Sequence, residues 1–196
     1  MNNIKVINQY TPSVAFGDSI SNAVIYIQKI LKSLGFESKI YIGITSVDIN
    51  FKHEVYHISQ YEQSKDNMLL FHHSIGHEHH DYILNFLDKK VMIYHNITPA
   101  HYFPKDSFLS EACIQGREQL KLNPEKFLAS IGDSNYNCKE LIINNYKNVQ
   151  ELPLLIDFDK HQTPSFNQEI INKYENTFNI LFVGRIVLNK CQHQLI

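Results

Sequence analysis

Short apolar segments alternate with segments of helical periodicity along most of this chain, and this alternation limits the folds available to it. Apolar residues recur at helical spacing from Ile20 to Leu34, and Gly35 is a natural end for that helix. Repeated strand–helix units pair their strands in parallel and cover both faces of the sheet with helices. The sequence therefore predicts an α/β fold with a Rossmann-like, doubly wound and mostly parallel sheet. Further helices are expected at residues 82–87, 106–122 and 134–146, and strands at 4–7, 38–43, 68–71, 91–94, 127–131 and from Val149.

Length and composition indicate one main domain with an appendage. The chain has 196 residues, of which 43% are hydrophobic and 19% charged, and these are values typical of a globular protein. A polar stretch that carries Pro164 follows the last expected strand. We therefore expect a Rossmann-like domain at 1–156, a linker region at 157–177 and the truncated start of another domain at 178–196.

Charge and cysteine content restrict partners and location. The net charge of −2 gives no support for a nucleic-acid partner. Three scattered cysteines favour a reducing compartment, and we expect a cytoplasmic protein without a signal peptide. No apolar run approaches the ~20 residues of a membrane span. Peripheral contact with the inner face of a membrane stays open, as does the oligomeric state.

Polar residues and glycine follow three of the expected strands. Gly17 and Asp18 lie in the first such loop, His72 and Ser74 in the second, and His95 in the third. Ligands bind to sheets of this kind at the carboxyl ends of the strands. A cap at the start of a helix is the alternative role for Asp18. Histidines after two neighbouring strands indicate a binding site.

The end of the chain has the pattern of a phosphate site. An apolar run at Ile180–Val183, which we expect to form a strand, meets Gly184, and a segment with the start of a helical pattern follows. Glycine lets a ligand approach the backbone, and the beginning of a helix attracts anions. Arg185 and Lys190 add two cations that suit phosphate oxygens. An edge strand with two solvated cations is the alternative.

Several motifs resemble, in order and spacing, the family four glycosyltransferases. Phe182-Val-Gly-Arg185 with Lys190 is similar to the opening of the family's donor domain, although Cys191 stands where the family usually has glycine. Leu69–Gly76 and Ile93–Pro99 are similar to acceptor-domain motifs, and Asp133-Ser134 with Glu140-Leu141 is similar to a further one.

The resemblance implies one half of a two-domain GT-B enzyme and a specific set of roles. The N-terminal domain of the family binds the acceptor, and the C-terminal domain binds a nucleotide-sugar. Transfer retains the anomeric configuration and uses no metal or other cofactor. The expected partners are a nucleotide-sugar donor and a glycan or lipid-linked glycan acceptor in bacterial polysaccharide assembly. The resemblance assigns catalysis to His95, donor phosphate binding to Gly17, Gly184, Arg185 and Lys190, and acceptor binding to Asp18, His72, Ser74 and Asn96.

Because the motifs of the donor domain stop near Lys190, we expect this chain alone to transfer little or no sugar. Two alternatives remain open. One is a glycan-binding module without catalysis. The other is a zinc metalloprotease, since His53-Glu54-Val55-Tyr56-His57 matches the H-E-x-x-H pattern. That pattern requires a helix, whereas its apolar residues indicate an extended segment.

Overall fold

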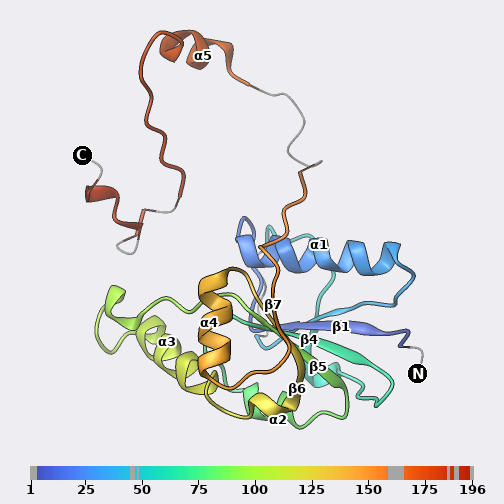
Figure 1. Cartoon of the computed structure of the whole chain (residues 1–196). Helices are drawn as coiled ribbons and strands as arrows, with labels where there is room; N and C mark the ends of the chain where they lie inside the picture. The colour runs from blue at the N-terminus through green and yellow to red at the C-terminus, as the bar shows by residue number, and fades with distance from the viewer. Residues whose placement is uncertain are drawn as a thin grey trace. The chain divides into compact units, whose positions relative to one another are not determined.

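The protein is described by a computed structural model that covers residues 4–44, 47, 49–158, 166–184, 186–187 and 190–194. Its centre is a seven-stranded, entirely parallel sheet in the order β3-β2-β1-β4-β5-β6-β7 (Figure 1). The predicted doubly wound α/β fold is confirmed. The strands are β1 (Ile7–Thr11), β2 (Ile40–Ile42), β3 (Tyr56–His57), β4 (Met68–His73), β5 (Lys89–Tyr94), β6 (Phe127–Gly132) and β7 (Val149–Glu151).

Helices cover both faces of the sheet. Helix α1 (Ser19–Ser33) lies on one face, and α2 (His80–Leu84) and α3 (Phe108–Gln119) lie on the other (Figure 1). Helix α4 (Asn135–Ile143) contributes Leu141 to the same core as α2 and α3. Short 3-10 turns occupy Ile58–Gln60, Ala100–Tyr102, Pro124–Lys126 and Gln192–Gln194.

Helix α1 shows how local chemistry produces these elements. Asp18 caps its beginning by accepting hydrogen bonds at Oδ2 from the backbone N–H and the hydroxyl of Ser21, each at 2.9 Å. Gly35 follows its end with a φ of +88°, a left-handed conformation that glycine adopts without steric cost. Val24 and Ile25 then pack against Ile40 of β2 on this face of the sheet.

Two strands differ from the prediction. We expected the first strand at residues 4–7, whereas β1 runs from Ile7 to Thr11. Its polar Asn8, Gln9 and Thr11 are buried, so hydrophobicity does not mark this strand. Strand β3 has only two residues, and no periodic pattern can identify so short a segment.

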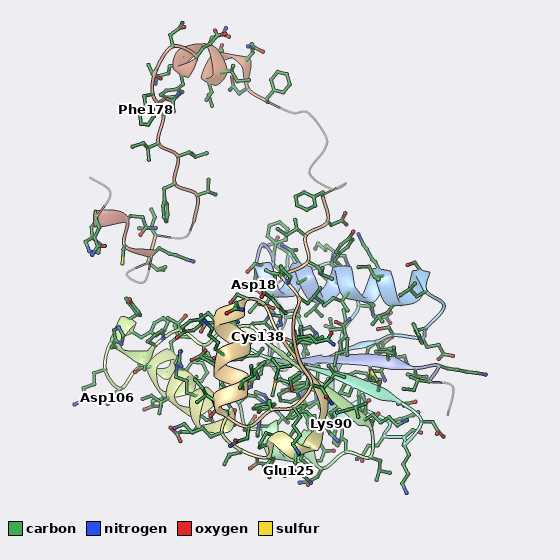
Figure 2. The ribbon with its side chains drawn as sticks, viewed as in Figure 1. Asp18, Lys90, Asp106, Glu125, Cys138 and Phe178 are labelled. Atoms are coloured by element: carbon green, nitrogen blue, oxygen red, sulfur yellow. The ribbon has the colours of Figure 1, made fainter. Side chains whose placement is uncertain are left out.

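The order of the strands places a ligand site at a specific point. The chain passes from β1 to β2 and β3 in one direction, and then returns to β4 on the other side of β1. In such sheets ligands bind beyond the carboxyl ends of the strands at the place where the direction reverses. Here that place is between β1 and β4. Figure 2 labels Asp18 at the beginning of α1, after β1, and Lys90 near the amino end of β5.

The chain divides after Ile156 into two compact units, 1–156 and 157–196. The second unit contains helix α5 (Gln168–Tyr174), which falls within the expected linker region. The predicted strand at Ile180–Val183 is wrong, because these residues form neither helix nor strand. A strand needs a neighbouring strand for its backbone hydrogen bonds, and no described residue pairs with this segment. Within the described parts of the chain, no helix has the length and apolar character needed to span a bilayer.

Candidate functional site

Polar side chains on three strands share the face of the sheet that α1 covers. Gln9 lies in β1 opposite Leu70 of β4, and His72 lies two residues further along β4. His72 in turn lies opposite Ile93 of β5, two residues before His95. Because side chains alternate between the faces of a strand, Gln9, His72 and His95 point to the same side. They extend from β1 across β4 to the end of β5, and so include the point between β1 and β4 where the sheet reverses direction.

These side chains form one continuous chain of hydrogen bonds. The Nε2 of Gln9 donates to the backbone carbonyl of Val24 at 3.0 Å, and its Oε1 lies 3.1 Å from Nε2 of His72. The Nδ1 of His72 lies 2.8 Å from Nε2 of His95. The Nδ1 of His95 lies 2.8 Å from Oδ2 of Asp133, directly after β6. The chain thus joins a carbonyl of α1 to a carboxylate at the other end.

The direction of each bond assigns a protonation state to His95. The carbonyl of Val24 can only accept, so the amide nitrogen of Gln9 faces it and the amide oxygen faces His72. His72 therefore carries its proton on Nε2 and accepts at Nδ1. His95 therefore donates from Nε2 to His72 and, beside an ionised Asp133, also from Nδ1 to that carboxylate. A histidine that donates from both nitrogens is an imidazolium cation.

Both histidines of this chain are buried, and burial favours the neutral form of a histidine unless a partner compensates for its charge. His72 is fully buried, and its burial together with the adjacent charge of His95 lowers its pKa well below the ordinary value of a histidine. The side chain of His95 is 2% exposed, and that of Asp133 is 20% exposed. A buried cation requires a partner, and Asp133 supplies it. Both N–H groups of such a histidine are donated within this chain, so it acts on a ligand only through its charge, and it has no free lone pair with which to accept a proton.

The sequence singled out His72 and His95, and the structure brings these two residues together. It did not assign a site role to Gln9 or Asp133. Asp133 follows β6 as His95 follows β5, so the same rule about carboxyl ends could have identified it. Gln9 is inside a strand that the pattern misplaced, and only the paired register reveals its position beside His72.

The remaining residues predicted in the first unit lie apart from this chain of hydrogen bonds. Asp18 acts as the cap of α1, which was the alternative role for it. Gly17 has a φ of +74°, and a Cβ added there would meet no atom within 4 Å. Asn96 is exposed with a φ of +54°, and Ser74 is half-buried in the loop after β4.

The other three residues predicted to bind the donor phosphates, Gly184, Arg185 and Lys190, belong to the second unit. Gly184 and Lys190 are exposed there, and no ligand-binding geometry can be ascribed to them. Arg185 lies outside the described residues.

A cavity of about 730 Å³ opens at the carboxyl ends of β1, β2 and β4. This volume is within the ~300–1,000 Å³ typical of small-molecule sites. Of the site residues that we predicted from the sequence, none of those that the structure describes lines it. The loop after β1 contributes Pro12 and Ser13, the loop after β2 Gly43 and Ile44, the loop after β4 Ile75, Gly76, His77, Glu78 and His79, and α3 Phe108, Leu109, Glu111, Ala112 and Gln115.

Helix α3 is held closely against the loop after β4. The backbone N–H of Gly76 donates to the carbonyl of Ala112 at 2.9 Å, and the side chain of Gln119 both accepts from the N–H of His77 and donates to its carbonyl. A Cβ at Gly76 would lie 2.5 Å from the backbone nitrogen of Gly116, and the converse distance is also 2.5 Å. This contact therefore requires glycine on both sides, and it fixes one wall of the cavity.

His77 lines the cavity as a neutral histidine. Its Nδ1 lies 3.1 Å from the hydroxyl of Tyr10, and burial, followed by the nearby His73 and His80, lowers its pKa to about 2. Its buried Nε2 has no hydrogen-bond partner among the described residues. Gly43 lies against this pair, since a Cβ there would come within 2.7 Å of the Tyr10 hydroxyl and 3.1 Å of Nδ1 of His79.

The H-E-x-x-H motif is not helical. His53 lies in a bend, and His57 is the second residue of β3, where its Nε2 lies 3.2 Å from the carbonyl of Gly43. The two histidines therefore lack the helical spacing that a zinc site of this type requires. Across the described ranges, no group of three or more His, Cys, Asp or Glu side chains is arranged to hold a metal ion.

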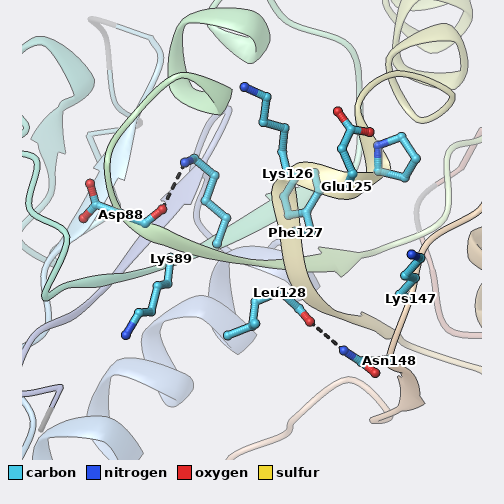
Figure 3. A pocket seen from close by; sticks show the side chains of 10 residues that line it. Asp88, Lys89, Glu125, Lys126, Phe127, Leu128, Lys147 and Asn148 are labelled. Atoms are coloured by element: carbon cyan, nitrogen blue, oxygen red, sulfur yellow. Dashed lines mark hydrogen bonds between the residues drawn. The ribbon is translucent and has the colours of Figure 1, made fainter. Parts of the chain in front are cut away.

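A smaller cavity of about 390 Å³ lies at the opposite end of the sheet, between the beginnings of β5 and β6 (Figure 3). Lys90 is buried there and donates from Nζ to the carbonyls of Phe86 and Asp88, at 2.6 and 3.0 Å. Burial lowers the pKa of Lys90. The exposed Lys89, Lys126 and Lys147 point in different directions and do not converge on one point (Figure 3). Lys90 therefore has a structural role, and the lysines around this cavity do not form an anion-binding site.

Comparison of the chain with protein-family models and with curated proteins finds no match. Its function is therefore inferred from its own residues and their geometry.

Proposed function

We propose that this chain is the acceptor-binding part of a retaining glycosyltransferase that takes its sugar from a nucleotide-sugar. The observation that carries the proposal is the hydrogen-bonded chain from Gln9 through His72 and His95 to Asp133, which ends at the carboxyl edge of the sheet. The cavity formed by the loops after β1, β2 and β4 opens at the same edge of the sheet and supplies a place for an acceptor.

The chemistry of sugar transfer suits a cation that cannot act as a base. Breaking the bond to a nucleoside diphosphate places negative charge on the leaving oxygens, and fixed donors and cations lower the energy of that charge. In this proposal His95 contacts the transferred sugar. Gly17, Gly184, Arg185 and Lys190 bind the donor phosphates, as the resemblance implies. Of the four residues that we expected to bind the acceptor, Asp18 caps α1 and His72 is buried against His95. Acceptor contact is therefore proposed for Ser74 and Asn96.

The proposal includes a location and a set of partners. We expect the protein in the cytoplasm, where Cys113 and Cys138 remain free thiols as in the structure. A nucleotide-sugar and a glycan are its substrates, and neither a metal ion nor another cofactor takes part. Peripheral contact with the membrane would bring it to a lipid-linked acceptor.

Transfer can be tested on two proteins, the 196-residue chain and the product of the complete reading frame that encodes it. Both are incubated with nucleotide-sugars and a panel of glycans, and release of nucleoside diphosphate and the anomeric configuration of the product are measured. We expect acceptor-dependent release with retention from the complete product, and little or none from the 196-residue chain. An inverted product, or turnover that does not depend on any acceptor, would contradict the proposal.

A glycan-binding module without catalysis is the second candidate. It is favoured by the completeness of the first unit, in which both hydrophobic cores and the whole cavity lie within residues 1–156. Binding of a glycan by the complete product, with no nucleotide-sugar consumed under any condition, would establish this candidate in place of the transferase.

A further inference from the structure

We propose that the cavity between the loop after β4 and helix α3 binds a neutral sugar ring, and that phosphate-bearing or carboxylate-bearing groups are excluded from it. This inference rests on the proposed function and specifies the class of acceptor. It also names a binding surface that differs from the residues expected from the sequence.

One face of α3 supplies two kinds of contact. Phe108, Glu111 and Gln115 follow one another at helical spacing and all line the cavity. Phe108 is 79% exposed in the first turn of α3, although a large aromatic side chain is normally covered. A sugar ring has an apolar face of C–H groups that suits an aromatic side chain, and hydroxyl groups around its edge. The carboxylate of Glu111 and the amide of Gln115 are placed to bind those hydroxyl groups.

The opposite wall repeats this combination of apolar and polar groups. Ile44 and Ile75 provide apolar surface, and the neutral ring of His77 lies beside them in the lining. A cavity that is mostly apolar with a few convergent polar groups is the usual form of a small-molecule site.

The charge of the lining selects against anions. Glu78 and Glu111 are the charged carboxylates of the lining, and no lysine or arginine is among the residues that form it. His77 is neutral at physiological pH, since burial lowers its pKa to about 2. Two negative charges and no fixed cation repel a phosphate or a uronic acid. A neutral sugar has no such penalty, so the acceptor end that enters this cavity is an uncharged glycan.

The geometry of the cavity is fixed before a ligand binds. The contact between Gly76 and Gly116 and the hydrogen bonds of Gln119 hold α3 against the loop after β4. A wall that is already in place costs little ordering free energy on binding.

The test is a binding experiment by NMR on the 196-residue chain. The probes are the methyl glycosides of glucose, galactose, mannose and N-acetylglucosamine, with glucuronic acid and glucose 1-phosphate as anionic counterparts. We expect saturation transfer to at least one neutral glycoside and shifts in the backbone amides of residues 76–79 and 108–115. We expect Phe108→Ala to weaken binding about tenfold, as is typical for the loss of an aromatic contact, and Glu111→Gln to weaken it as well.

Two variants on the same helix serve as controls. Ile114→Ala removes an exposed apolar side chain that does not line the cavity, and Glu118→Gln removes a carboxylate away from it. Both should bind as the wild type does. Equal or tighter binding of the anionic probes, absence of binding by every neutral glycoside, or equal effects of the cavity variants and the controls would overturn the inference.

The outcome is separable from that of the proposed function. If the cavity binds a neutral glycan but the complete product transfers no sugar, the inference about the cavity stands and the proposed transferase function is wrong. If the complete product transfers sugar to an anionic acceptor that binds elsewhere, the transferase function stands and the inference about the cavity is wrong.

Discussion

At the scale of single residues, the hydrogen bonds around His95 leave one arrangement of protons. The carbonyl of Val24 orients the amide of Gln9, the amide determines the tautomer of His72, and His72 makes His95 a donor at both nitrogens. Gln9 therefore influences the charge of a residue that it does not touch. This property belongs to positions in space, and the sequence alone contains no sign of it.

Replacement of Gln9 tests the proton arrangement directly. We expect the wild-type protein at pH 7 to show protons on both ring nitrogens of His95 in ¹⁵N–¹H correlation spectra. In Gln9→Met the acceptor for His72 is lost, so His72 can adopt the other tautomer and His95 no longer has to donate from both nitrogens. Gln28→Met is the control, because Gln28 also donates to a backbone carbonyl, that of Ser38, at 2.9 Å and is not a member of this chain. A bare nitrogen on wild-type His95 at pH 7 would show that the assignment is wrong.

The candidate site was predictable from the sequence only in part. The rule that ligands meet the carboxyl ends of strands identified His72 and His95, which the structure joins at 2.8 Å. Asp18 was ambiguous because a cap and a ligand contact need the same residue type. The cavity was missed, because its lining comes from four separate segments whose residues are ordinary when read one at a time.

At the scale of elements, strands with uniform apolar character were predictable and the others were not. Strands β4, β5 and β6 contain long apolar runs, and the sequence located each of them. Strand β1 buries polar side chains that form hydrogen bonds with neighbouring elements, so the sequence placed this strand a few residues too early. The segment at Ile180–Val183 has the composition of a strand, but no described strand pairs with it.

The contact of α3 with the loop after β4 predicts that replacing a helical glycine with alanine destabilises the protein, which is the opposite of the usual effect. Alanine normally stabilises the interior of a helix relative to glycine, by about 1 kcal/mol. At Gly116 a Cβ would lie 2.5 Å from the nitrogen of Gly76 and 2.8 Å from Cδ1 of Ile97. We expect Gly116→Ala to destabilise the protein by about 1–3 kcal/mol, as overpacking does. Urea unfolding measures the change, and Ile114→Ala on the same helix should have little effect. Stabilisation of Gly116→Ala would contradict the contact.

At the scale of the whole molecule, the fold holds several histidines in their neutral form. Burial is the main cause that lowers the pKa of His72, of His73 (to about 4), of His77 (to about 2) and of His80. Their ordinary value in an unfolded chain is about 6.5. Between these values the unfolded chain binds more protons than the folded one, so stability is complete above about pH 6.5 and falls as the pH decreases.

Acid should therefore unfold the protein under mild conditions. Each such histidine removes up to about 1.4 kcal/mol of stability per pH unit between its unfolded and folded pKa. Domains are stable by only ~5–15 kcal/mol, so we expect a steep loss between pH 6 and pH 4. Urea unfolding from pH 7.5 to 4.5 measures the slope, and His73→Gln should make it shallower. The exposed His101 provides a control, since His101→Gln should leave the slope unchanged. If the stability of the wild type does not change over this range, the prediction that these four histidines are neutral in the folded protein is wrong.

The overall architecture could be read from the alternation of strands and helices, because backbone pairing and right-handed connections leave few arrangements for such a pattern. The function could not be read in the same way, since one α/β scaffold serves many reactions. His95 shows how the fold contributes to a site: this residue follows a buried strand, and its hydrogen-bond partners come from β4 and from the loop after β6, with Gln9 of β1 bound to His72.

The central claim is that His95 acts in sugar transfer, and the rate of nucleoside diphosphate release tests it most directly. The product of the complete reading frame is assayed with a nucleotide-sugar and a neutral glycan as the wild type, as His95→Ala and as the surface control His101→Ala. We predict that His95→Ala slows release by ~10²-fold or more, as loss of preorganised electrostatic stabilisation does, and that His101→Ala has no effect. Equal rates for the wild type and His95→Ala would contradict the account.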